Sequence, residues 1–406
     1  MVDQITRTVR QGFLSRMANS FMGILIGLVM VPGSVCLVSW NEYRTVHRSR
    51  GLAEAEDVTL EVVDPFEIDS TQNERLVHVS GTVTTEETLQ DPEFGVEQQA
   101  LRLQRKVEMF QWVEHKESKT RDKLGGGKET VTTYRYERKW QEGRENSDSF
   151  EERAGHENPP LKYAAQDRTT VQATLGSFRL SSEIIERKMN SWSELAVDQS
   201  KALSRLDEAA KQHFRIEPSR LYYSAMLPSS SEPQVGDLRI SFRSVQPTQV
   251  SVLSKQAGSE LSPFKTSNGE LIEHLMLGKV STTEMFNSLK FENTMLAWIL
   301  RVVGWVLSIV GFSLITGPLK TLAAIIPPLG SLVGTMSFMV SFLLGTIVTL
   351  ISIAVAWIAV RPLFGITLLL LAGGAIYLLT RRSKSNTMQA AGSYGPPPVP
   401  PPLPNA

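Results

Sequence analysis

The chain has 406 residues, which is enough for one sizeable folded domain in addition to membrane segments. Its 42 basic and 42 acidic residues cancel, so the overall charge gives no argument for binding nucleic acid, and we expect no nucleic acid among its partners. Cys36 is the only cysteine, which excludes an intrachain disulfide and a zinc site built on cysteines.

Residues 1–20 are predicted to form a basic amphipathic N-terminal segment. Apolar side chains recur at a spacing of four, at Ile5, Val9, Phe13 and Met17, with arginines elsewhere on the helical wheel. This pattern is typical of a short helix lying on an anionic membrane surface, and a disordered basic leader is an equal alternative.

An apolar run over residues 21–39 predicts the first transmembrane helix. The run is longer than the apolar part of an ordinary signal peptide and no small-residue cleavage pattern follows it, so we expect it to remain uncleaved. Trp40 and Tyr43 follow the run and suit the membrane–water interface. Gly23 and Gly27 form a GxxxG motif, which lets a neighbouring helix of the same chain or of a second copy approach closely.

Residues 40–294 are the only part of the chain polar enough to form a water-soluble domain. β-branched and aromatic residues predict strands over 76–83, 101–117 and 130–140, and the glycines at 125–127 mark the tip of a long hairpin between the last two. This part is therefore predicted to be a mainly-β or α+β domain.

Weaker signals predict further elements of this domain. Strands are expected over 170–180, 236–245 and 249–255, the last two joined as a hairpin at Gln246-Pro247-Thr248, and a helix is expected over 201–214. From Thr282 onward an amphipathic pattern predicts a helix that leads into the second membrane crossing.

Three more apolar runs, over 295–317, 331–360 and 362–380, are each long enough to cross a bilayer. The chain contains no acidic residue after Glu292. The predicted fold class is thus a polytopic α-helical membrane protein with four transmembrane helices and a mainly-β or α+β soluble domain between helices 1 and 2. The distribution of basic residues favours a cytoplasmic location for both termini and an extracytoplasmic or lumenal location for the domain.

Particular residues of these crossings are candidates for anchoring and packing. Trp298, Arg301 and Arg361 are expected at the membrane interface, where arginine can extend its charged end to water. Ser337, Ser341 and Gly345 follow one another at a spacing of four in the third crossing. Together with the GxxxG motif they predict a packed helix bundle and self-association.

Residues 381–406 form a basic and then proline-rich segment that we expect to be a disordered cytoplasmic tail. Two P-x-x-P spacings, Pro397 to Pro400 and Pro401 to Pro404, could dock on a proline-recognising module. An unbound tail is the favoured interpretation.

The sequence nominates no catalytic or metal-binding constellation. The six histidines are scattered, and no Gly-x-Ser-x-Gly motif is present. We therefore expect no catalytic residue, no metal and no cofactor, and we interpret the protein as a non-enzyme. Ionisable groups in the middle of the predicted helices, which would mark a transport pathway, are missing from the sequence.

Several stretches resemble the transmembrane protein 43 family, also called LUMA, in order and spacing. They are NERLVHVSG at 73–81, DPEFGV at 91–96, LRLQRKVEMFQWVE at 101–114, VGDLRISF at 235–242, Pro263-Phe264, and Arg361-Pro362-Leu363. The resemblance covers nearly the whole chain except the first residues and the proline tail.

The resemblance implies four crossings, a large domain between the first and second, and no established enzymatic activity. Animal members are similar proteins of the endoplasmic reticulum and inner nuclear membrane, with lamina and emerin partners, but the proline-rich tail departs from their pattern. We expect a multi-pass protein of the cytoplasmic membrane if the source is prokaryotic, and of the endoplasmic reticulum or inner nuclear membrane if it is eukaryotic.

The expected function is a non-enzymatic membrane scaffold that organises membrane protein complexes or membrane structure. Its expected partners are the lipid bilayer, further copies of itself and other membrane proteins. A membrane-tethered lipid-binding or enzymatic domain is the alternative.

Overall fold

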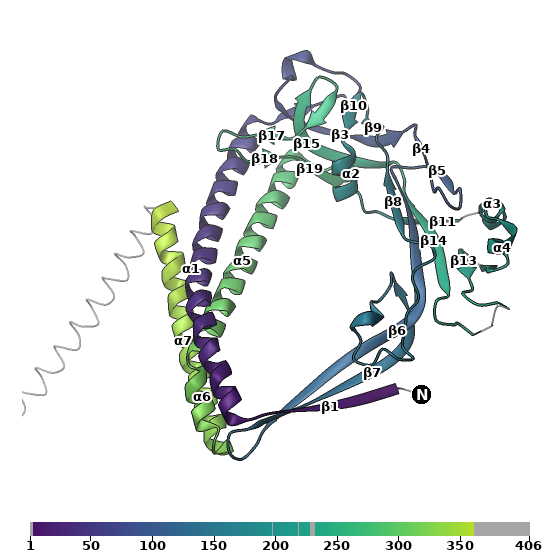
Figure 1. Ribbon diagram of the computed structural model, residues 1–406. Helices are drawn as coiled ribbons and strands as arrows, with labels where there is room; N and C mark the ends of the chain where they lie inside the picture. Colours follow the sequence, from purple (N-terminus) through teal and green to yellow (C-terminus); the bar gives the residue numbers. More distant parts are fainter. Residues whose placement is uncertain (1–2, 197, 218, 228–231, 361–406) are drawn as a thin grey trace, which may run out of the picture.

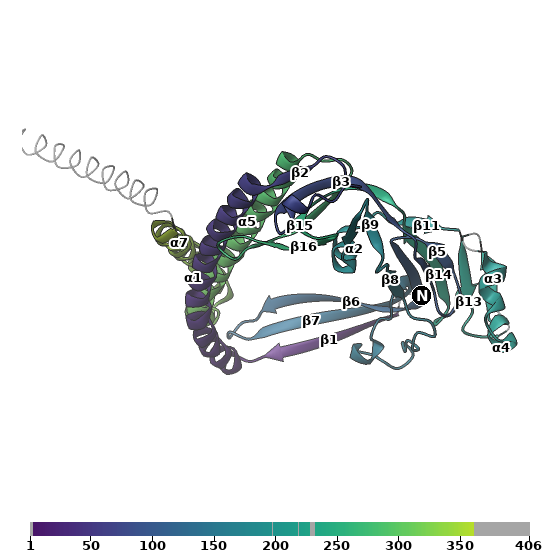
Figure 2. The ribbon, with the colours of Figure 1, turned by 90° about the horizontal axis from the view of Figure 1, so that it is seen from above.

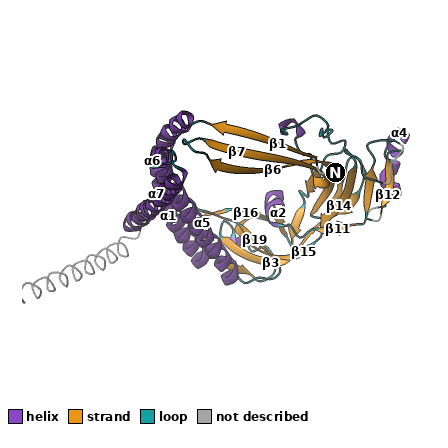
Figure 3. Ribbon diagram, turned by 90° about the horizontal axis from the view of Figure 1, so that it is seen from below, coloured by secondary structure: helices purple, strands orange, loops and turns teal. Residues whose placement is uncertain are grey.

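The computed structural model describes residues 3–196, 198–217, 219–227 and 232–360. Long helices form one side of the molecule and β-sheets form the other (Figures 1 and 3). The helices are α1 (Phe13–Val58), α5 (Thr282–Ile315), α6 (Gly317–Ala323) and α7 (Pro327–Val360). The predicted crossing at 362–380, the tail at 381–406, Arg361 and the four tail prolines lie outside the described residues.

Three of these helices, α1, α5 and α7, are long and apolar enough to cross a membrane. This agrees with the predicted crossings at 21–39, 295–317 and 331–360, and a large β-rich domain lies between the first and second. The α1 helix is 46 residues long, however, and continues past the predicted crossing to Val58. The segment from Asn41 to Val58 therefore adds about 27 Å of polar helix at 1.5 Å per residue.

The α5 helix extends beyond the apolar region in the same way. It begins at Thr282, where the side chain of Ser281 accepts a hydrogen bond from the backbone N–H of Glu284. Its first turns bury Met285, Phe286 and Leu289 against the domain, as the amphipathic pattern predicts. Both α1 and α5 thus run without a break from the apolar bundle into the soluble domain.

The larger β-sheet has eight strands, six of which follow the order β1-β7-β6-β14-β13-β12, while β11 and β8 pair with β14 and β6. Its strands are β1 (Asp3–Gln11), β6 (Arg102–Asp122), β7 (Lys128–Glu142), β8 (Gln166–Thr169), β11 (Ser193–Leu195), β12 (Phe214–Glu217), β13 (Arg220–Tyr223) and β14 (Leu238–Val245). The antiparallel β6–β7 pair confirms the predicted long hairpin.

The second sheet has seven strands in the order β19-β15-β16-β10-β9-β3-β2, with an additional β15–β3 pairing. Its strands are β2 (Leu60–Val62), β3 (Leu76–Thr85), β9 (Ala173–Leu175), β10 (Phe178–Leu180), β15 (Thr248–Ala257), β16 (Glu260–Ser262) and β19 (His274–Leu277). Two small ribbons, β4 (Thr88–Gln90) with β5 (Glu97–Gln99) and β17 (Phe264–Lys265) with β18 (Leu271–Ile272), complete the β-structure.

The expected hairpin between residues 236–245 and 249–255 is wrong, although both strands exist. The first strand, β14, pairs with β6, β11 and β13, whereas the second, β15, pairs with β3, β16 and β19. Between them Pro247 has no N–H to donate to a ladder. The chain passes here from one sheet to the other.

The helix expected over 201–214 is also wrong in its extent. The structure has two short helices, α3 (Gln199–Ser204) and α4 (Glu208–Lys211), and Phe214 already begins β12. Asp207 accepts a hydrogen bond from the backbone N–H of Ala210 and so starts a second helix inside the predicted one. A third helix of the domain, α2 (Ser182–Lys188), is capped in the same way by Ser181.

The N-terminal segment differs most from the prediction, because residues 3–11 form a strand and not a helix. The segment contains four β-branched residues, Ile5, Thr6, Thr8 and Val9, which suit a strand, and here β1 pairs along its whole length with β7. Arg7 and Arg10 form ion pairs of 2.5 and 2.9 Å with Glu151 and Glu129 of the domain.

The hairpin tip lies against the beginning of α1 (Figures 1 and 2). Arg16 donates to the backbone oxygen of Gly126 over 2.7 Å and forms an ion pair of 3.0 Å with Asp122. The pairing of β1 with β7 brings residues 3–11 beside the hairpin at the beginning of α1. The expected topology would place them on opposite sides of the membrane.

Candidate functional site at the junction of helices and domain

Helices α1 and α5 lie against each other through small side chains. On each helix buried small or polar residues recur every seven positions: Gly27, Ser34 and Asn41 on α1, and Ala297, Gly304 and Gly311 on α5. The heptad spacing keeps one seam facing the neighbouring helix, and small residues let the two backbones approach. The interface is therefore a close-packed antiparallel pair.

The predicted packing residues all lie at interfaces within the chain. A methyl group added to Gly27 would lie 2.5 Å from the carbonyl oxygen of Gly311, and one added to Gly23 would lie 3.6 Å from Leu314. Gly345 on α7 faces Ile309 of α5 in the same manner.

The two predicted serines of α7 also contact a neighbouring helix segment. Ser337 donates to the hydroxyl of Thr316 over 2.6 Å, and the hydroxyl of Ser341 lies 3.4 Å from the same oxygen. These contacts account for the small-residue stripes through packing of one bundle. Self-association through them stays a prediction.

A buried ion pair joins three helices where the apolar region of α1 ends. Arg301 of α5 donates to both carboxylate oxygens of Glu42 of α1, over 2.6 and 2.8 Å, and Trp357 of α7 donates to the same carboxylate over 2.8 Å. The side chain of Glu42 is only 2 % exposed. A buried carboxylate requires hydrogen-bond donors, and here the guanidinium and indole N–H groups supply them.

Three of the predicted interface anchors lie close in sequence to the residues of this ion pair. Trp40, Tyr43 and Trp298 remain exposed, and the Arg301 guanidinium lies 4.9 Å from the ring centre of Trp298. The sequence predicted that Arg301 would extend its charged end to water. In the structure Arg301 instead contacts the carboxylate of Glu42 and the ring of Trp298.

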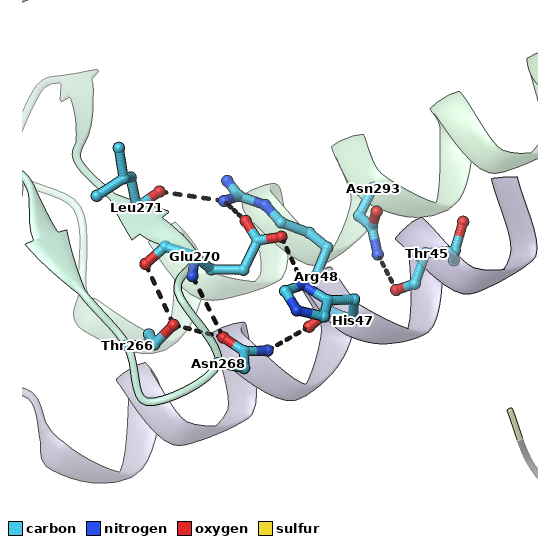
Figure 4. Close-up of polar contacts among 8 residues, drawn as sticks. All are labelled: Thr45, His47, Arg48, Thr266, Asn268, Glu270, Leu271 and Asn293. Carbon is cyan, nitrogen blue, oxygen red and sulfur yellow. Dashed lines mark hydrogen bonds and ion pairs between the residues drawn. The ribbon is translucent and has the colours of Figure 1, made fainter. Parts of the chain in front are cut away.

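Two asparagines bridge the same helix pair closer to the domain. Asn41 of α1 donates to the carbonyl oxygen of Ala297, and Asn293 of α5 donates to the carbonyl oxygen of Thr45, both over 3.0 Å. The second bridge is visible in Figure 4. Amide bonds from opposite helices fix the register of α1 against α5.

On the domain side of these amide bridges, the loop between β17 and β18 contacts α1 (Figure 4). Arg48 donates to Glu270 over 2.7 Å and to the carbonyl oxygen of Leu271 over 3.1 Å, while His47 lies 3.1 Å from the same carboxylate. Asn268 donates to the backbone oxygen of His47 over 2.8 Å. The loop between β17 and β18 is thus held to two turns of α1.

Two opposing effects act on the pKa of the Glu270 carboxyl group at this contact. Burial alone would raise the pKa of its carboxyl group, but hydrogen bonds from Arg48 and His47 outweigh burial and lower the pKa below its ordinary value of 4.5. Glu270 is therefore ionised at neutral pH and holds Arg48 as a charged partner.

More contacts extend the junction towards the end of α1. Glu54 accepts hydrogen bonds from the backbone and hydroxyl groups of Ser267, and Lys290 of α5 forms an ion pair of 2.5 Å with Glu56. Gly51 lies so close to Glu270 that an added methyl group would be 2.9 Å from its side-chain carbons. Packing and charge therefore fix the domain to the polar ends of α1 and α5.

We define the junction as Glu42, Arg48, Glu270, Asn293 and Arg301 with their partners. The charged side chains of the junction are paired with one another, so their role is to hold parts of the protein together. In the described part of the chain, no group of three or more His, Cys, Asp or Glu side chains could hold a metal ion.

Sequence reasoning missed Glu42 and Glu270, although one signal was present for the first. Glu42 lies two residues beyond Trp40, and Arg301 lies three residues inside Trp298. Because both tryptophans mark the interface, the two charges belong at a similar depth. Nothing in the sequence connects Arg48 with Glu270, which are separated by 222 positions.

Comparison with known proteins shows to which family the chain belongs. The family model of Transmembrane protein 43 matches residues 109–362. Transmembrane protein 43 of Homo sapiens is 33 % identical over 388 residues, covering 92 % of this chain and 92 % of its own. The homolog of Drosophila melanogaster is 31 % identical over 374 residues, covering 88 % of this chain and 94 % of its own.

The mouse protein gives a similar result, with 32 % identity over 376 residues, 89 % of this chain and 90 % of its own. No solved structure matches this chain. The extent and identity of these matches show that the chain belongs to the transmembrane protein 43 family.

Proposed function

We propose that this membrane protein is a scaffold that organises membrane protein complexes or membrane structure through self-association and partner binding. A membrane scaffold binds some partners in water and others in the bilayer. It must keep its two binding surfaces at a fixed position relative to each other. The observation that carries the proposal is the junction, in which α1 and α5, joined by a buried ion pair, continue into the domain and the loop between β17 and β18 binds α1.

The energetic balance of the junction supports a fixed connection. Arg48 and Glu270 are each about a quarter exposed, so their ion pair alone contributes little, typically up to about 1 kcal/mol. The buried Glu42–Arg301 pair, the amide bridges and the packed glycine seam hold the two helices to each other. The helices are held to the domain by buried packing of Leu52 and Phe286 against Leu76 and Leu253. Bending the domain away would break this packing together with the contacts of the β17–β18 loop.

Self-association is tested by counting copies of the full-length chain in native membrane vesicles. We expect a fluorescent protein fused to the chain to bleach in two or more steps per spot. Single steps at all expression levels would contradict the self-association part of the proposal.

Partner binding is tested by crosslinking in the same membranes, with and without the combined change Phe286→Ala and Glu270→Ala, which removes buried packing and an ion pair between the helices and the domain. If the junction presents the domain to partners, the variant should insert normally and lose crosslinks made through the domain. The matched control is Glu208→Ala, which removes an exposed acid of α4 outside the junction. Identical crosslinks in all three proteins would contradict the proposed role of the junction.

A further inference from the structure

A cavity of about 500 Å³ lies beside the junction, between the domain and the two long helices. Arg48 of α1, Lys188 of α2, His274 of β19 and Glu292 of α5 contribute to its wall. Four elements from separate parts of the chain therefore converge on one space.

The cavity wall contains a buried polar atom that lacks a partner. His274 is only 3 % exposed, and its Nε2 atom has no hydrogen-bond partner among the described residues. Buried polar atoms are almost always paired, because leaving one unpaired destabilises the folded protein. Such an atom beside a cavity points to a polar ligand.

Charges around the cavity are paired except for two of opposite sign. Arg48 contacts Glu270 over 2.7 Å, and Arg187 contacts Glu273 over 3.0 Å. Lys188 and Glu292 also line the cavity, and neither forms an ion pair within the described part of the chain. The wall thus offers one cation and one anion to a ligand.

The position of the cavity along α5 relates it to the outer edge of a headgroup layer. Glu292 precedes the exposed interface residue Trp298 by six positions, which is about 9 Å along α5. The polar layer on each side of a bilayer is about 5–8 Å thick, so Glu292 lies just on the water side of a layer that begins at Trp298. A headgroup that extends outward from a lipid beside α5 reaches the cavity from this layer.

The lining chemistry distinguishes between headgroups. A phosphodiester carries one negative charge and accepts hydrogen bonds from an ammonium or an imidazole N–H. A primary ammonium donates to carboxylates, whereas the quaternary ammonium of choline is typically bound by aromatic rings. Among the described residues that line this cavity, histidine is the only aromatic side chain.

We propose that this cavity binds the phosphoethanolamine headgroup of a membrane phospholipid. Lys188 and the Nε2 atom of His274 hold the phosphate, and the carboxylate of Glu292 receives the primary ammonium. The mixed wall also disfavours a purely anionic headgroup, because Glu292 and Glu183 would repel it.

The test uses the full-length protein in detergent with added lipid, measured by native mass spectrometry. The arms are phosphatidylethanolamine, phosphatidylcholine and phosphatidylglycerol, and soluble glycerophosphoethanolamine is added as a competitor. We expect the wild type to retain phosphatidylethanolamine best, and Lys188→Ala or Glu292→Gln to weaken retention about tenfold. Lys162→Ala, at an exposed lysine outside the cavity wall, is the control and should retain lipid like the wild type.

Each other outcome would overturn part or all of the proposal. Equal retention of the three lipids, unaffected by either variant, would remove the site. Preference for phosphatidylglycerol would exclude the role of Glu292, and preference for phosphatidylcholine would exclude recognition of a primary ammonium. Full displacement by stoichiometric glycerophosphoethanolamine would identify the ligand as a soluble headgroup and not a membrane lipid.

Discussion

Arg301 and Glu42 face each other across 259 positions of sequence and form a two-pronged ion pair at the end of the apolar helix bundle. The pair ties α5 to α1, and Trp357 adds α7 to it. It lies between the packed glycines of the bundle and the loop that holds the domain. Three long helices are therefore connected with one another through this carboxylate.

The first prediction concerns that carboxylate. Glu42→Gln leaves the Arg301 charge without its partner in a buried site, and removing one partner of such a pair costs about 3–5 kcal/mol. Adding Arg301→Met should recover much of the stability, because the double variant contains no unpaired charge. Unfolding of the full-length protein in detergent measures all four members of the cycle.

Additive losses in the double variant would contradict the coupling of these two residues. Glu117→Gln serves as the control, because it removes one partner of an exposed pair with Lys119 and should change the stability little.

The second prediction concerns the glycine seam. Gly27→Leu forces a side chain against the backbone of Gly311, and such overpacking typically costs about 1–3 kcal/mol. Gly33→Leu is the matched control on the same helix, because nothing lies within 4 Å of a methyl group added there. Thermal unfolding should show a lower Tm for Gly27→Leu alone.

The oligomer distribution of the two variants separates the two roles of the GxxxG motif. Packing within the chain predicts an unchanged distribution on native gels. A shift to smaller oligomers with wild-type Tm would instead assign Gly27 to contacts between copies.

The third prediction concerns the pH dependence of stability through His274. Burial, followed by the charges of Lys188, Arg48 and Arg187, lowers the pKa of His274 from 6.5 to about 4. Between these values the unfolded chain binds a proton that the folded chain does not, so stability falls as the pH drops from 6.5 to 4. The contribution is on the order of 3 kcal/mol.

His274→Gln should flatten this part of the stability profile, measured by unfolding between pH 4.5 and 7. His115→Gln is the control, because His115 is half exposed and pairs only at the surface. A wild-type slope in His274→Gln would show that another group causes the dependence.

The fourth prediction tests the pairing of β1 with β7. Thr6 and Thr133 are directly opposite in this ladder, and opposite residues of antiparallel strands have Cα distances that suit a disulfide. In a Cys36→Ser background, Thr6→Cys with Thr133→Cys should crosslink in intact membranes. Thr6→Cys with Thr120→Cys should not, because Thr120 belongs to β6 and faces Thr130.

A crosslink would place the N-terminal strand and the hairpin on one side of the membrane. Its absence, with the two cysteines labelled from opposite sides of sealed vesicles, would support the topology expected from the sequence.

Elements with strong local patterns could be predicted from the sequence. The apolar runs gave the three long helices, and the alternating residues on both sides of Gly125 gave the long hairpin. Both depend on neighbours in sequence, so composition and periodicity are sufficient for them.

Features that depend on distant partners could not be predicted. Residues 3–11 form a strand that pairs with β7, and the two strands around Pro247 pair with different distant partners, β14 with β6 and β15 with β3. The junction has the same origin, since Glu270 and Arg48 are 222 positions apart and meet only in the folded chain.

The central claim is that the domain and the helices form one rigid unit, and a distance between spin labels tests it most directly. Labels at Leu25→Cys on α1 and Glu260→Cys on β16, in a Cys36→Ser background, should give one narrow distance distribution by double electron–electron resonance in nanodiscs. Phe286→Ala combined with Glu270→Ala should broaden that distribution, because it removes both buried packing and the ion pair between the helices and the domain, while Glu208→Ala should leave it unchanged. A broad or multiple distribution in the protein with an intact junction would contradict the account.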